Sequence, residues 1–112
     1  MDTMSLIEAV EIRAFDLGSA INRETRLEDE RALVKQAAIR RLMESRSLSA
    51  TAAEKIVEED ETYMAHRAEQ REAVLARQVA YGQYEAARLR AQLAVNMSER
   101  VVYSYSPPQA DF

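Results

Sequence analysis

The chain has one histidine, His66, and no cysteine, which limits the chemistry that its side chains can perform. Zinc and di-iron sites use several ligands at fixed helical spacings, as in H-E-x-x-H, and the neighbours of His66 supply no such pattern. One histidine leaves no recognisable set of Ser, His and Asp, and Gly18 and Gly82 alone cannot form a glycine-rich phosphate loop. We therefore expect no catalytic, metal-binding or cofactor-binding residues and interpret His66 as a surface histidine.

Four consecutive acids extend from Glu58 to Glu61. Calcium sites need a loop with spaced oxygen ligands and a glycine turn, and this run has neither. Acids just ahead of a helix interact favourably with the positive end of its dipole. The run therefore predicts solvated acids at a helix junction rather than a metal site.

Tyr and Arg side chains on a helix expected over residues 62–97 form the one group with a functional interpretation. At about 100° per residue they occupy a band about 100° wide, which faces away from the expected core. Interfaces favour Tyr and Arg because their rings and guanidinium groups provide contact area and hydrogen bonds together. The candidate interface consists of Tyr63, Arg67, Val74, Arg77, Tyr81, Tyr84 and Arg88.

Three neighbours could cover this candidate interface. A second copy of the chain, giving a four-helix dimer, ranks first, and the segment 51–61 folded back on the helix ranks second. Nucleic acid, with Arg on phosphates and Tyr on bases, ranks third because the net charge is −4. Bases exceed acids within residues 63–100, but the acidic first half of the chain can neutralise that excess.

The helix over 62–97 is predicted from apolar or small residues that recur at spacings of three and four. Gly82 and Ala86 should let a neighbouring helix approach closely, and Leu89 and Leu93 should pack in the tightest part of the core. The expected buried stripe consists of Met64, Ala68, Leu75, Val79, Gly82, Ala86, Leu89, Leu93 and Met97.

A first helix is predicted over residues 5–45. Ser5 and Glu8 form a capping box at its start. Gly18 and the polar stretch 22–31 weaken the pattern, but charge pairs three and four residues apart, Glu28 with Arg31 and Arg26 with Glu30, support a continuous helix there. Its expected stripe consists of Ile7, Val10, Ala14, Leu17, Ile21, Thr25, Glu28, Ala32, Lys35, Ile39 and Leu42.

The connection and the C-terminal end carry their own signals. Thr51 and Glu54 form a second capping box, which predicts a short helix over 51–60. The β-favouring run Val101–Tyr105 and the prolines after it predict an extended tail over 98–112. The tail is interpreted either as a docking peptide or as a flexible or self-packed segment.

These elements predict an all-α fold. Residues 1–97 should form an antiparallel helical hairpin of two long helices joined by a short helix, completed by dimerisation and followed by the extended tail. The polar residues that interrupt the two stripes should meet in a layer that sets the register of the hairpin. These residues are Thr25, Glu28 and Lys35 on the first helix and Arg71, Glu72 and Gln78 on the second.

Sequence features also bear on location. No apolar run approaches the ~20 residues of a membrane span, and the N-terminal residues MDTMSLIEAVEIRA contain acids where a signal peptide needs an apolar core. The absence of cysteine fits a reducing compartment. We therefore expect a cytoplasmic protein without a membrane partner.

The connection and the last helix resemble a known group of proteins. The residues SLSATAAEKIVEEDETY (47–63) and EAARLRAQL (85–93) are similar to small uncharacterised helical proteins of bacteriophages and prophages. The resemblance covers mainly residues 47–93 and brings no catalytic residues. It implies a bacterial host cytoplasm and an accessory role in phage DNA metabolism or host takeover.

Three functions are compatible with these observations. The first is a non-enzymatic, homo-oligomeric interaction protein that acts as an adaptor or inhibitor of a larger protein of unknown identity. The second is a nucleic-acid-binding accessory protein that uses the basic Tyr and Arg face. The third is a phage assembly or scaffolding component, which predicts larger assemblies.

Overall fold

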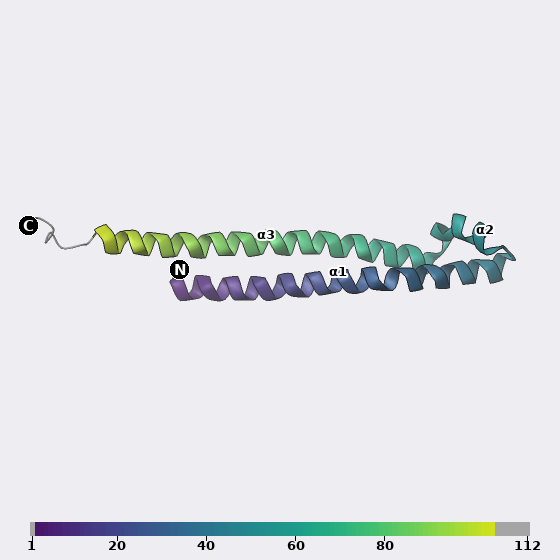
Figure 1. Cartoon of the computed structure of the whole chain (residues 1–112), viewed down its shortest axis with the longest axis horizontal. Coiled ribbons are helices and arrows are strands. Elements are labelled where there is room, and N and C mark those ends of the chain that lie inside the picture. The colour runs from purple at the N-terminus through teal and green to yellow at the C-terminus, as the bar shows by residue number, and fades with distance from the viewer. Residues whose placement is uncertain (1, 105–112) are drawn as a thin grey trace, which may run out of the picture. The chain divides into compact units, whose positions relative to one another are not determined.

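The computed structural model describes the backbone of residues 2–104 and the side chains of residues 2–98. It contains the long helix α1 (Thr3–Arg46), the short helix α2 (Ala50–Lys55), the 3₁₀ helix η1 (Val57–Glu59) and the long helix α3 (Glu61–Ser104), as Figure 1 shows. The described residues contain no strand. The predicted all-α class and the two long helices with a short helix between them are confirmed.

Helix α1 is unbroken through Gly18 and through the polar stretch 22–31, so its predicted continuity is confirmed. It begins two residues earlier than expected because Asp2 caps it: the Ser5 backbone N–H donates to Oδ1 of Asp2 at 2.7 Å. The same hydrogen bond lowers the pKa of Asp2. The capping box predicted at Ser5 and Glu8 is therefore not the start of the helix.

The end of α1 is closed by a left-handed residue. Ser47 has a φ of 53°, and the Leu48 backbone N–H donates to the Met43 carbonyl at 3.2 Å. This six-to-one hydrogen bond is the Schellman arrangement, which satisfies a carbonyl that the helix itself leaves unpaired. The chain then turns away from α1 toward α2.

The connection contains the predicted short helix, but its cap is different. Ser49, not Thr51, caps α2, since Oγ of Ser49 accepts a hydrogen bond from the Ala52 backbone N–H at 3.2 Å. Helix α2 ends at Lys55, and η1 continues the connection to Glu59. Ala53 and Val57 are the buried residues of these two elements.

Helix α3 starts after Asp60 and runs to Ser104. The prediction of an extended segment from Ser98 onward is wrong for residues 98–104, and residues 105–112 lie outside the described part of the chain. A helix that has already formed extends at little cost, so the weak β preference of the valines does not end it. Pro107 is three residues beyond the last helical residue.

The chain forms two compact units. One consists of residues 18–79, and the other of residues 1–17 together with 80–112. In the first, the α1 residues Glu24, Glu30 and Arg41 pair with Arg77, His66 and Asp60, so that partner numbers fall as α1 numbers rise. In the second, Arg13 donates to Gln83 at 3.1 Å. The two long helices are therefore antiparallel, as predicted for a hairpin (Figure 1).

The buried face of α3 differs from the predicted one. Leu75, Val79, Leu89 and Leu93 are 61%, 60%, 56% and 60% exposed, and Ala68, Gly82 and Met97 are also exposed, so the predicted core stripe is wrong at these positions. It is correct in part at Met64, which packs against the core cluster, and at the half-buried Ala86. The buried residues are instead Tyr63, His66, Ala73, Ala80 and Ala87.

Both faces of α3 have the three-and-four spacing of a helical seam, which is why spacing alone did not distinguish them. The polar partners on α1 do distinguish them, because His66 and Arg77 meet Glu30 and Glu24. On α1 the predicted stripe is correct at the buried Leu42 and in part at four half-buried positions, namely Val10, Leu17, Lys35 and Ile39.

 The α1 prediction is wrong at six exposed positions, namely Ile7, Ala14, Ile21, Thr25, Glu28 and Ala32.

The largest core cluster lies in the unit formed by residues 18–79. Ala38, Val57 and Tyr63 are its buried members, and Val34, Ile39 and Met64 pack against them. The expectation that Leu89 and Leu93 form the tightest part of the core is therefore wrong. Neither long helix, over the part of the chain that the structure describes, has the apolar stretch needed to cross a membrane.

Candidate interaction surfaces

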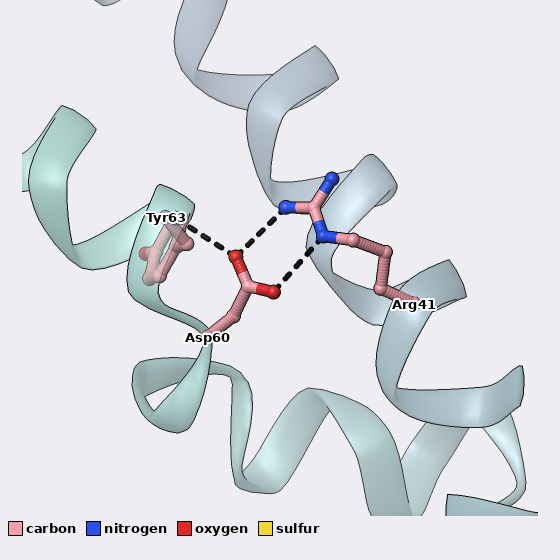
Figure 2. A network of polar contacts seen from close by, with 3 residues as sticks. All are labelled: Arg41, Asp60 and Tyr63. Carbon is pink, nitrogen blue, oxygen red and sulfur yellow. Dashed lines mark hydrogen bonds and ion pairs between the residues drawn. The ribbon is translucent and has the colours of Figure 1, made fainter. Parts of the chain in front are cut away.

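A network of three residues joins α1 to the start of α3 (Figure 2). Nε and Nη2 of Arg41 donate to the two carboxylate oxygens of Asp60 at 3.0 and 2.7 Å, and the Tyr63 backbone N–H donates to Oδ2 at 2.9 Å. Asp60 thus caps α3 while it binds the guanidinium group in a bidentate manner. This residue is not the solvated acid that the sequence predicted, because its side chain is only 10% exposed.

The ion pair shifts the pKa of both partners. The hydrogen bond from Arg41 is the main cause that lowers the pKa of Asp60, with a smaller contribution from the Tyr63 backbone N–H. In return, the hydrogen bond to Asp60 raises the pKa of Arg41. These contacts hold the connection in place, so we assign this network to folding and not to ligand binding.

A polar layer does cross the helix pair in the unit formed by residues 18–79, but its members are not those predicted. Glu24 binds Arg77, and Arg23 lies 3.8 Å from Glu69. Thr25 and Glu28 are exposed instead, and Lys35 pairs with Glu54 of α2 at 3.4 Å. The prediction that opposite charges meet between the two helices is confirmed, but the residues that form these pairs are not the predicted ones.

His66 is buried, at 9% exposure, so its interpretation as a surface histidine is wrong. Neither ring nitrogen has a hydrogen-bond partner among the described residues, and Nε2 lies 3.7 Å from Oε2 of Glu30. Within the described part of the chain, no group of three or more His, Cys, Asp or Glu side chains is arranged to hold a metal ion. His66 is thus an incompletely satisfied residue of the helix seam.

The candidate interface predicted from Tyr and Arg does not form one surface. Tyr63 is a member of the core cluster, Arg77 binds Glu24, and Arg67 donates to Gln70 at 3.3 Å. Together with the half-buried Val74, these residues belong to the unit formed by residues 18–79. The chain's own fold therefore uses Tyr63 and Arg77.

The other three candidates belong to the unit formed by residues 1–17 and 80–112. Tyr81 is exposed and Tyr84 is half-buried. Arg88 lies 2.9 Å from Oε2 of Glu85, and this hydrogen bond raises the pKa of Arg88. Tyr81 and Arg88 are therefore accessible to a partner, and their role in an interface stays a prediction.

The same unit has an apolar surface that the sequence analysis placed in the core. We call it the α3 stripe, and define it as Gly82, Ala86, Leu89 and Leu93. Leu89 and Leu93 are more than half exposed, and a Cβ atom built on Gly82 meets no atom within 4 Å. The stripe is therefore an apolar helix face, as its spacing predicts, but its leucines are not covered by the chain's own α1.

Helix α1 of this unit also exposes large apolar side chains. We call the group Met4, Ile12 and Phe15 the α1 patch; Phe15, at 76% exposure, is the most exposed of the three. At about 100° per residue the three side chains lie within about 80° of one another on the helix. Glu8 and Glu11 lie on the same face between Met4 and Ile12, so Ile12 and Phe15, three residues apart, are the adjacent apolar pair of the patch. Exposed large apolar side chains of this kind are candidates for contact with other proteins.

The structure also has an open depression of about 330 Å³, lined by Ser19, Asn22, Arg23 and Arg26 of α1. Its two arginines resemble an anion site, but both already have carboxylate neighbours. Arg23 lies 3.8 Å from Glu69, and Arg26 lies 3.8 Å from Glu30. All four lining residues come from one helix face, so the depression does not have the convergent groups of an active site.

Comparison of the chain with models of protein families, with curated proteins and with solved structures finds no match.

Proposed function

We propose that this chain is a non-enzymatic helical interaction protein that forms homo-oligomers and acts as an adaptor or inhibitor of a larger protein. The observation that carries the proposal is the exposure of large apolar side chains on both long helices, above all Phe15, Leu89 and Leu93. Following the resemblance to phage proteins, we propose the bacterial host cytoplasm as its location and phage DNA metabolism or host takeover as its setting.

Energetics support binding through these side chains. Full burial of a Leu or Phe side chain contributes about 1.5–3 kcal/mol, and these residues leave more than half of that contribution unused in the single chain. A partner that covers two or three of them gains enough free energy to offset part of the cost of association. The α1 patch is our candidate surface for the larger protein.

Nucleic acid is a weaker candidate as the partner. Arg77 and Arg88 of the basic face bind Glu24 and Glu85, so contact with phosphates would have to compete with these carboxylates. A phage assembly or scaffolding role would use the same apolar surfaces and predicts assemblies larger than a dimer.

The experiment is capture of the target by the tagged full-length chain in its bacterial host, with three variants compared. The wild type should retain a protein that the double variant Ile12→Ser/Phe15→Ser loses. The variant Asp16→Asn, at an exposed position of the same helix but about 100° around it from Phe15, is the control and should retain it. A double variant that captures the same protein as the wild type would contradict the assignment of the α1 patch.

DNA binding is measured in parallel at low and moderate salt. The proposal predicts no steep salt-dependent affinity. An affinity that falls steeply with salt and disappears when Arg67 and Arg88 are changed to Glu would overturn the proposal in favour of a nucleic-acid-binding protein.

A further inference from the structure

We propose that a second copy of this chain docks on the α3 stripe, with the two α3 helices parallel. This inference rests on the proposed function, because it specifies how the homo-oligomer forms. It uses residues 82–93, which all belong to the unit formed by residues 1–17 and 80–112.

The α3 stripe faces away from the chain's own α1. Ala80 and Ala87 are the buried residues of this part of α3. At about 100° per residue, the stripe residues Leu89 and Leu93 lie at least about 120° around the helix from Ala87. A second helix can therefore cover the stripe without displacing α1.

The stripe has the spacing of a coiled-coil seam. Its four residues are separated by four, three and four positions, which places Ala86 and Leu93 at one core position of the heptad and Gly82 and Leu89 at the other. In a parallel pair each residue meets its own copy, so one stripe is sufficient for a closed twofold contact. Gly82, whose Cβ position is open, and Ala86 then allow a close approach of the two backbones.

Charges beside the stripe identify the occupant and its direction. Glu85 and Arg90 flank the stripe on opposite sides and are five residues apart. In a parallel pair of helices, residues with this relation face each other across the seam, so Glu85 of each chain meets Arg90 of the second copy. The ion pair between Glu85 and Arg88 uses Oε2 and leaves Oε1 available to this second arginine.

An antiparallel pair does not use these charges. With Gly82 opposite Leu93 of the second copy, each flank of the stripe meets the same flank of its partner. Glu85 then lies beside Gln92, and Arg90 lies beside Gln83, so no ion pair forms between the chains. The charge pattern is therefore complementary only in the parallel arrangement.

Cysteine cross-linking of the full-length chain tests this arrangement, since the natural sequence contains no cysteine. Leu93→Cys should give a covalent dimer on oxidation, because core residues of a parallel pair are close enough for a disulfide. Tyr81→Cys is the control: it is exposed but lies off the stripe, and it should remain monomeric on a non-reducing gel.

A charge exchange gives an independent readout in sedimentation experiments. Glu85→Arg should weaken dimerisation by about tenfold, because it replaces two attractive pairs by repulsion. The double variant Glu85→Arg/Arg90→Glu should restore the affinity, since the pairs form again with reversed signs. Restoration would show that the loss in the single variant comes from the charge pairs between the chains and not from a misfolded helix.

Each alternative outcome has a distinct meaning. A dimer in which Tyr81→Cys cross-links and Leu93→Cys does not would overturn this inference and place the contact on the Tyr and Arg face, leaving the proposed function intact. Cross-linking only between Gly82→Cys and Leu93→Cys chains would overturn it in favour of an antiparallel pair. A chain that stays monomeric and captures no target would remove both proposals.

Discussion

Asp60 is the residue on which the connection between the helices most depends, since it caps α3 and binds Arg41 at the same time. Asp60→Asn keeps a capping oxygen but removes the charge. We expect it to lower the free energy of unfolding by about 1–2 kcal/mol at pH 7, measured by urea denaturation. Glu59→Gln is the control, because its pair with Arg46 is half exposed on both sides and should change stability by less than about 0.5 kcal/mol. Equal losses in the two variants would contradict this role of Asp60.

The same carboxylate predicts a pH dependence. Its pKa in the folded chain is below the ordinary value of 3.8, so its contribution to stability is fully present above that value and is lost as the pH falls through the lowered pKa. The stability difference between the wild type and Asp60→Asn should therefore stay constant down to about pH 5 and shrink below it. Urea denaturation of both proteins between pH 6 and pH 2 measures this difference. If the stability difference between the two proteins grows as the pH falls, the pKa of Asp60 is not lowered by folding.

His66 lies in the helix seam with two ring nitrogens that make no hydrogen bond to the described residues. Buried polar atoms in this state cost about 1–3 kcal/mol each. His66→Leu should therefore raise the free energy of unfolding by about 1 kcal/mol or more at pH 7, whereas His66→Gln, which keeps a polar group there, should not. Loss of stability in the leucine variant would show that the nearby Glu30 makes a stabilising contact with the ring.

At the scale of the elements, Gly18 is a weak point in α1. It lies within the helix, and a Cβ atom at this position would meet no atom within 4 Å. Gly18→Ala should stabilise the chain by about 1 kcal/mol, because alanine loses less backbone freedom on folding. Thermal unfolding should show a midpoint higher by a few degrees, and Ala14→Gly, at an exposed position of the same helix, should lower it. An unchanged midpoint in both variants would indicate that α1 is already frayed around residues 14–18 in the folded chain.

The helices themselves could be predicted because their signals are local. Charge pairs and the absence of proline between Ser5 and Ser45 indicated one continuous helix, and α1 is continuous. The predicted end of α3 is too early, since the β preference of Val101 and Val102 is weaker than the tendency of a formed helix to continue. The caps lie at Asp2 and Ser49, a few residues before the predicted Ser5 and Thr51, because any Asp, Asn, Ser or Thr near a helix start can cap it.

The choice of face could not be predicted in the same way. Helix α3 has two seams with equal spacing, one containing Ala80 and Ala87 and the other containing Leu89 and Leu93. Residue size favours the leucines as core, but the buried face is decided by contacts with α1, such as Glu24 with Arg77, which sequence spacing does not contain. The candidate interface was therefore divided, with Tyr63 in the core and Tyr81 at the surface.

At the scale of the whole molecule, each unit is held by contacts between α1 and α3, while large apolar side chains stay outside those contacts. Under the proposed function, the seam of polar and small residues holds each unit together, and the exposed leucines bind other chains. A short chain of long helices buries only part of its apolar surface by itself, which is consistent with this proposal. It also predicts that substitutions of Leu89 affect association much more than folding.

Sedimentation equilibrium of the wild type, Leu89→Glu and Phe15→Glu measures directly whether two copies of the chain associate through Leu89. The wild type should approach twice the chain mass of 12.7 kDa as concentration rises, and Phe15→Glu should behave in the same way. The dissociation constant of the Leu89→Glu dimer should be about tenfold higher or more, because the dimer no longer buries a leucine side chain at this position in either chain. A wild type that stays at 12.7 kDa at every concentration, or a Leu89→Glu variant that associates as the wild type does, would contradict the account.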